Sequence, residues 1–178
     1  MVLKWLKVLL VVCAAPAAIS LMFFYLDITS ASFSIVLNFS LMMWVTILET
    51  QLKPSLASRY YYPYSFEKQG ELYRVLGIAW YRAILLKTGW EKLRQQQTPI
   101  TKKLQNVVAY ERASRVAEAG HMVVGIIVLG ITGYVSATYS VADARWLILF
   151  NVLLNVYPVL LQRHIRPRLQ RTIARYSA

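Results

Sequence analysis

Four long apolar segments constrain the fold of this chain more than any other feature. They cover residues 8–26, 33–52, 120–139 and 146–162. A helix that crosses the hydrocarbon core of a bilayer needs about 20 mostly apolar residues, and these segments reach or approach that length. The chain is also 57% hydrophobic, whereas a soluble domain has about 45–50% apolar residues. The sequence therefore predicts an all-α polytopic membrane protein with four transmembrane helices in a single membrane domain, residues 1–178.

The first segment has a competing interpretation as a signal peptide. Lys4 and Lys7 precede an apolar stretch that small residues follow, which is the order found in signal peptides. The apolar run nevertheless continues through "ISLMFFYL", well beyond the small residues of "CAAPAA". We therefore favour an uncleaved transmembrane helix.

Basic residues predict the orientation in the membrane. With the N-terminus in the cytosol, every one of the 20 Lys and Arg residues except Arg145 lies on the cytoplasmic side. The two outer loops, "DITSAS" and "SVADAR", are short. Because positive charge gathers on the cytoplasmic side of membrane proteins, both termini are predicted to be cytoplasmic, in a bacterial cell membrane. The same rule accounts for the net charge of +12, so this charge does not indicate a nucleic-acid partner. The sequence also lacks a soluble basic domain that could bind nucleic acid.

A long cytoplasmic segment, residues 53–119, joins spans two and three. Since structureless connections of this length are uncommon, it should contain helices. Within it, "ELYRVLGIAWYRAILLKTGW" (71–90) places apolar residues on one helical face and basic residues elsewhere. This pattern predicts an amphipathic helix in the membrane interface. From about Lys103, a further helix is predicted to run directly into span three.

An acid and a histidine stand where the third span begins. Glu118 and His121 are three residues apart, a spacing at which a carboxylate can accept a ring N–H of the imidazole. Such a bond fixes the tautomer and raises the basicity of the ring. Alternatively, Glu118 pairs with Arg115 or another arginine, and His121 reaches the headgroups. Ionisable groups at membrane depth are often functional, which keeps the first interpretation open.

Amides are spaced along the fourth span. Asn151, Asn155 and Gln162 fall at i, i+4 and i+11. Amides inside a span most often hydrogen-bond neighbouring helices, so helix association is their simplest role.

Arginines follow the fourth span in "QRHIRPRL" (162–169). Arg163, Arg166 and Arg168 are placed to bind phosphate, either of lipid or of a coenzyme A or carrier prosthetic group, because a guanidinium grips phosphate oxygens in pairs. The alternative is a basic stop signal at the end of a span.

Hydride chemistry, nucleotide chemistry and serine hydrolysis of the usual kind are unsupported, because their motifs are missing. The chain has no P-loop, dinucleotide fingerprint, GxSxG elbow or HExxH pair. Cys13 is the only cysteine, so neither an intramolecular disulfide nor a CxxC zinc site can form. We expect no metal site and no tightly bound cofactor.

Three motifs together resemble those of one small family. "YSFEKQG" (64–70) resembles its FxFEKxG element, and "SRVAEAGHM" (114–122) resembles its RxxExxH element. "NVYPVLLQRHIRPRL" (155–169) resembles its closing element, NVP followed by QRxxRPRL. The family is that of the glycosyl-4,4'-diaponeurosporenoate acyltransferases, and the resemblance covers roughly residues 60–169. Its named activity esterifies a fatty acyl chain onto the glucose of a carotenoid glycoside.

The resemblance implies a set of functional residues and substrates. The residues are Phe66, Glu67, Gly70, Arg115, Glu118, His121, Asn155, Gln162, Arg163, Arg166, Pro167 and Arg168. On this expectation, His121 is the general base, Glu118 orients it, and the other polar residues contact the substrates. The implied co-substrate is an acyl thioester of coenzyme A or acyl carrier protein. The acceptor is a glycosylated carotenoid or similar glycolipid, met at the cytoplasmic interface among membrane lipids.

Two other functions remain alternatives. A small non-catalytic subunit or lipid-binding factor of a larger membrane complex also suits four spans with amides between them. A transporter is a weaker alternative, because no internal repeat or pair of broken helices is evident. The sequence leaves open whether the chain forms a homo-oligomer or joins other membrane subunits.

Overall fold

The described part of the chain is helical, with no strand. The computed structural model describes residues 2–67, 70–90 and 104–177. Four of its helices are long and apolar enough to cross a membrane, which confirms the predicted fold class. In chain order the elements are α1 (Val2–Tyr25), α2 (Ala31–Leu52), η1 (Arg59–Tyr61), η2 (Ser65–Glu67), α3 (Glu71–Val75), α4 (Ile78–Lys87), α6 (Leu104–Thr138), α7 (Arg145–Asn151), the π-helical turn η3 (Val152–Val156) and α8 (Tyr157–Ser177).

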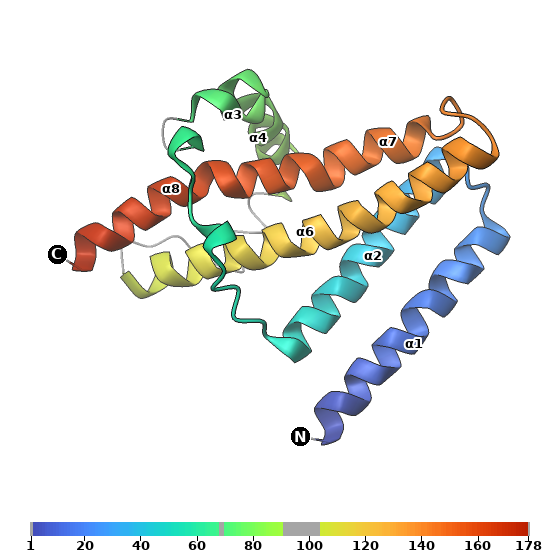
Figure 1. The fold of residues 1–178 in the computed structure, drawn as a ribbon, viewed down its shortest axis with the longest axis horizontal. Helices are drawn as coiled ribbons and strands as arrows, with labels where there is room; N and C mark the ends of the chain where they lie inside the picture. Colours follow the sequence, from blue (N-terminus) through green and yellow to red (C-terminus); the bar gives the residue numbers. More distant parts are fainter. Residues whose placement is uncertain (1, 68–69, 91–103, 178) are drawn as a thin grey trace. The chain divides into compact units, whose positions relative to one another are not determined.

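The chain forms two compact units. Figure 1 labels the α-helices of both units and colours them in chain order from blue to red. The first, here called the apolar unit, comprises Met1–Ser55 and Gly120–Val156. The second, here called the basic unit, comprises Leu56–Ala119 and Tyr157–Ala178. Helix α6 contributes its first half to the basic unit and its second half to the apolar unit.

The apolar unit is built from helices with one packed face and one exposed face. Its core contains Phe33, Leu37 and Leu41 of α2 and Val124 and Val128 of α6, all buried. Outward-facing residues of α1 are also apolar, and most of them are exposed. Apolar side chains on the outside suit a lipid environment, because hydrocarbon is as good a surrounding for them as a protein core.

The helix of the third span has the extent that the sequence predicts, whereas the helix of the fourth span is interrupted and longer than predicted. Helix α6 begins at Leu104 and continues without a break to Thr138, which confirms the helix predicted to run into span three. In the fourth span, α7 passes into the π-helical turn η3 and then α8. Helix α8 extends to Ser177, so the residues after Gln162 are helical where a basic tail was expected.

The predicted interfacial helix over 71–90 is wrong as a single element. It is divided into α3 and α4 at Gly77, whose φ of 72° lies in the left-handed region that glycine adopts without strain. On the predicted apolar face, Val75 is 82% and Trp80 is 63% exposed, which is compatible with the predicted contact of this face with lipid. Protein packing instead uses the opposite face, where Tyr73 and Tyr81 are buried.

Candidate functional site

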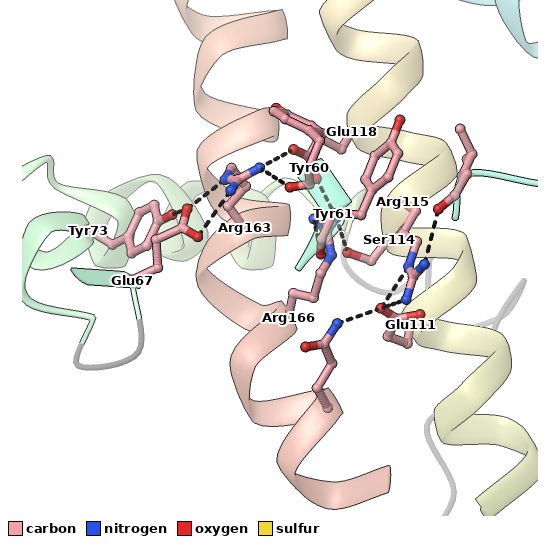
Figure 2. A network of polar contacts seen from close by, with 12 residues as sticks. Tyr60, Tyr61, Glu67, Tyr73, Glu111, Ser114, Arg115, Glu118, Arg163 and Arg166 are labelled. Atoms are coloured by element: carbon pink, nitrogen blue, oxygen red, sulfur yellow. Dashed lines mark hydrogen bonds and ion pairs between the residues drawn. The ribbon is translucent and has the colours of Figure 1, made fainter. Parts of the chain in front are cut away.

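Arg163 of α8 joins two carboxylates in the basic unit (Figure 2). Its Nε and Nη2 donate to the two oxygens of Glu67 at 2.6 and 3.0 Å. Its Nη1 donates to Oε1 of Glu118 at 3.0 Å. The Glu118 side chain is fully buried and that of Glu67 nearly so. A guanidinium has five donors in a fixed plane, so it can bind one acid with two bonds and still reach another.

Arg166 lies one turn along α8 and is almost entirely buried. It forms an ion pair with the second oxygen of Glu118 and donates to the Ser114 hydroxyl at 3.2 Å. Its guanidinium also lies over the ring of Tyr61, 5.6 Å from the centroid. Because both oxygens of Glu118 face arginines, this carboxylate connects α6 to α8. Of the two predicted alternatives for Glu118, the structure shows the pairing with arginines and not the orientation of His121.

Glu67 is held from several directions. Besides Arg163, the Tyr73 hydroxyl donates to it at 2.6 Å and the Tyr64 backbone N–H at 2.7 Å. Burial alone raises the pKa of a carboxyl, but the bonds from Arg163, Tyr73 and Tyr64 outweigh burial, so the pKa of Glu67 lies below its ordinary value. Burial and the neighbouring Glu67 carboxylate raise the pKa of the Tyr73 hydroxyl. Glu67 is therefore an anion at neutral pH, and Tyr73 is its neutral donor.

A second cluster follows along α6. Arg115 donates through Nε to Glu111 at 2.8 Å and through Nη1 to the Leu56 carbonyl at 3.0 Å. Gln170 of α8 also donates to Glu111, at 3.2 Å. Arg115, which was predicted to contact substrate, is thus bound to protein oxygens that tie α6 to α8 and to the chain near Leu56.

A pocket of about 590 Å³ opens between α3, α4 and α8 of the basic unit. Its volume lies in the range of small-molecule sites. It is lined by Glu67, Gly70, Glu71, Tyr73, Arg74, Ile78, Ala79, Arg82, Ala83, Leu86, His164, Pro167, Arg168 and Arg171. Four arginines and a histidine therefore share the pocket with an apolar strip.

A buried polar cluster lies in the apolar unit around Asn155 of the π-helical turn η3. The Asn155 amide nitrogen donates to Oδ1 of Asn38 at 2.6 Å and to Oδ1 of Asn151 at 2.9 Å. Asn151 in turn donates to the Gly125 carbonyl at 3.1 Å. The His121 ring hydrogen-bonds the Asn155 side chain and the Leu154 backbone, and its Nδ1 is buried without a partner in the described residues.

Glycine 125 makes the cluster possible. A Cβ at this position would lie 3.3 Å from Cβ of Asn155, which is tighter than ordinary van der Waals contact. The small residue thus lets the amide turn approach α6 closely. Since π-helical turns are frequently found at functional sites, the cluster joins the basic pocket as a second candidate region.

The structure separates the predicted site residues into three groups. Glu67, Glu118, Arg115, Arg163 and Arg166 form protein ion pairs, as described above. His121 and Asn155 lie in the buried amide cluster, while Gln162 is partly buried in α8. Of the three arginines predicted to hold phosphate, the structure places Arg168 in the pocket lining.

The sequence interpretation missed several pocket residues. His164, Tyr73, Arg74, Arg82 and Arg171 were not among the predicted site residues, although all line the pocket. His164 stands inside the "QRHIRPRL" motif, which was the one available signal. Within the described residues, no group of three or more His, Cys, Asp or Glu side chains could hold a metal ion.

These features define a helical membrane protein with a basic, partly apolar pocket. The family model of the glycosyl-4,4'-diaponeurosporenoate acyltransferases matches residues 57–175. The match covers more than half of the chain, so the protein belongs to this acyltransferase family of carotenoid biosynthesis. No curated protein and no solved structure matches the chain.

Proposed function

We propose that the protein transfers a fatty acyl chain from a thioester to a sugar hydroxyl of a glycosylated carotenoid or similar glycolipid. The observation that carries this proposal is the family match over residues 57–175, which spans nearly all of the basic unit with its pocket. Both substrates are amphiphiles, with an apolar chain and a polar head. A reaction between their polar head groups takes place at the membrane surface. The distribution of basic residues favours the cytoplasmic surface as the side of this reaction.

His121 is the proposed general base. Both hydrogens of the Asn155 amide are donated to Asn38 and Asn151, so Asn155 offers the imidazole its oxygen. A neutral imidazole that donates through one ring nitrogen keeps the other unprotonated. We assign this second role to Nδ1, which is buried and has no partner in the described residues. A buried polar atom without a partner is unusual, and readiness to accept a substrate proton explains it.

The reaction can be written as a balanced transfer. His121 takes the proton from the sugar hydroxyl, and the oxygen attacks the thioester carbonyl carbon. The tetrahedral intermediate collapses with cleavage of the carbon–sulfur bond, and the thiolate leaves with the proton returned by His121. General base catalysis of this kind contributes about 10²–10⁴-fold in rate.

The experiment is mass spectrometry of lipid and pigment extracts from cells that carry the gene, lack it, or express His121→Gln. The proposal expects deletion to remove an acylated glycoside and to accumulate its unacylated precursor, with no rescue by His121→Gln. Val123→Ala is the control, because Val123 lies on the same helix and is 46% exposed. Unchanged extracts after deletion would exclude the proposed reaction.

A further inference from the structure

The pocket of the basic unit carries a positive charge that its own residues do not balance. Arg74 and Arg82 reach it from α3 and α4, and Arg168 and Arg171 reach it from α8. Two carboxylates also line it, but Glu67 is already bound by Arg163 through two hydrogen bonds. Among the described residues that line the pocket, Glu71 is the one acid left for four guanidinium groups.

Unbalanced arginines on both sides of one cavity favour an anion between them. A guanidinium does not lose its proton in proteins, so the charges cannot be relieved by titration. Arg82 of α4 and Arg168 of α8 line this cavity together with His164. A membrane stop signal needs positive charge near the bilayer, but it does not require arginines from three helices to line the same pocket.

The apolar strip of the pocket limits the shape of the ligand. Ala79 and Ala83 are one helical turn apart on α4 and line the pocket with Ile78 and Leu86. Small side chains flanked by larger ones form a narrow surface, which suits a slender chain better than a broad ring system. The ligand therefore combines anionic groups with a thin, weakly polar arm.

His164 adds an unpaired polar group to the same pocket. Its Nδ1 is buried and has no hydrogen-bond partner in the described residues. The ring lies against Tyr73, 5.3 Å between centroids, and beside Gly70, where a Cβ would be 3.5 Å from the imidazole. Gly70 has a φ of 75°, so a side chain at this position would strain the backbone.

We propose that this pocket binds the phosphate groups of a coenzyme A thioester, with Arg82 and Arg168 as main contacts and the pantetheine arm along the alanine strip. The identity of the ligand rests on the proposed acyl transfer. Four arginines exceed what a single phosphodiester, such as that of a carrier prosthetic arm, needs for neutralisation. Coenzyme A carries a diphosphate and a further monophosphate, and arginine is well suited to each.

The test measures binding of coenzyme A itself to the purified full-length protein in nanodiscs of zwitterionic lipid, by equilibrium dialysis. Arg82→Gln and Arg168→Gln should each raise Kd about tenfold to a hundredfold, the effect of losing one charge-assisted hydrogen bond. Arg175→Gln is the matched control, because Arg175 is an exposed arginine of the same helix outside the pocket. Its Kd should stay within about twofold of the parent value.

Three results would overturn the inference. One is the absence of coenzyme A binding to the parent protein. Another is an equal loss of affinity in Arg175→Gln and Arg82→Gln, which reports diffuse charge instead of a pocket. The third is a parent protein that binds phosphatidylglycerol vesicles but not coenzyme A, and that loses vesicle binding in Arg82→Gln. This result would assign the pocket to lipid phosphate. The lipid extracts test the proposed function separately from coenzyme A binding. If the cells make an acylated glycoside but the purified protein does not bind coenzyme A, the pocket inference is wrong and the proposed function stands.

Discussion

At the scale of single residues, Arg163 carries the most connections of the described charged groups. It bonds Glu67 and Glu118, which reach it from different elements. Removing one partner of a buried ion pair typically costs about 3–5 kcal/mol, because the remaining charge is left buried without compensation. Arg163→Ala should therefore lower the melting temperature in detergent by several degrees or prevent folding, as measured by size-exclusion chromatography after heating.

Two other variants make this prediction specific. Arg163→Lys keeps the charge but loses the planar pair of bonds to Glu67, so its melting temperature should fall between those of Arg163→Ala and the parent. Arg175→Ala removes an exposed arginine from the same helix and should change little. Equal melting temperatures for Arg163→Ala and Arg175→Ala would contradict the role assigned to Arg163.

Glu67 should make stability depend on acid. Its pKa is lower in the folded protein than the ordinary value of 4.5, so its ionised form contributes stability above that value. This contribution is lost as the pH falls through the folded pKa. Glu67→Gln should therefore flatten the decline in melting temperature as the pH falls below that ordinary value. Glu71→Gln, a change at an exposed carboxylate, should keep the parent slope, and an identical slope for Glu67→Gln would refute the assignment.

The sequence motifs identify which charged residues to consider, but not which residues they pair with. The motifs selected Glu67, Glu118, Arg163 and Arg166, which the structure joins in ion pairs. They did not give the partners, because spacing along a helix identifies only neighbours on that helix. Glu118 is 45 positions from Arg163, and this tertiary contact replaces the pairing with His121 that an i, i+3 spacing predicted.

At the scale of elements, Gly77 separates two helices that the hydrophobic pattern merged into one. Periodicity could not predict the break, because it reports which side chains are apolar and not where the backbone turns left-handed. Gly77→Ala should destabilise the protein by about 1–2 kcal/mol, the cost of placing a Cβ in that conformation. Thermal unfolding in detergent measures this loss.

Gly130→Ala is the matched control for the Gly77 substitution. Gly130 lies inside α6, and a Cβ there would meet nothing within 4 Å. Since alanine favours a helix interior over glycine by about 1 kcal/mol, this change should be neutral or stabilising. A loss of stability in Gly77→Ala together with unchanged or higher stability in Gly130→Ala would support the break at Gly77. Similar losses of stability in both variants would contradict it.

At the scale of the whole molecule, the helix content and the four long apolar helices agree with the sequence expectation, but the pocket did not follow from it. Long apolar runs determine spans almost by themselves, since a bilayer requires every backbone polar group to be satisfied internally. The pocket depends on how α3, α4 and α8 pack. Arg82 and Arg168 are 86 positions apart in the sequence, and no periodic pattern relates residues at such a distance.

The orientation of the whole chain gives the last prediction. The distribution of basic residues predicts that both termini lie in the cytosol and residues 140–145 outside. Cys13 is the only cysteine, so a Cys13→Ser background allows single probes. Asp143→Cys should react with a membrane-impermeant maleimide in intact cells, because it lies in the proposed outer loop. Arg175→Cys, on α8, should react only after permeabilisation. The reverse pattern would place the basic pocket on the side without cytosolic acyl thioesters, and the proposed donor would then be wrong.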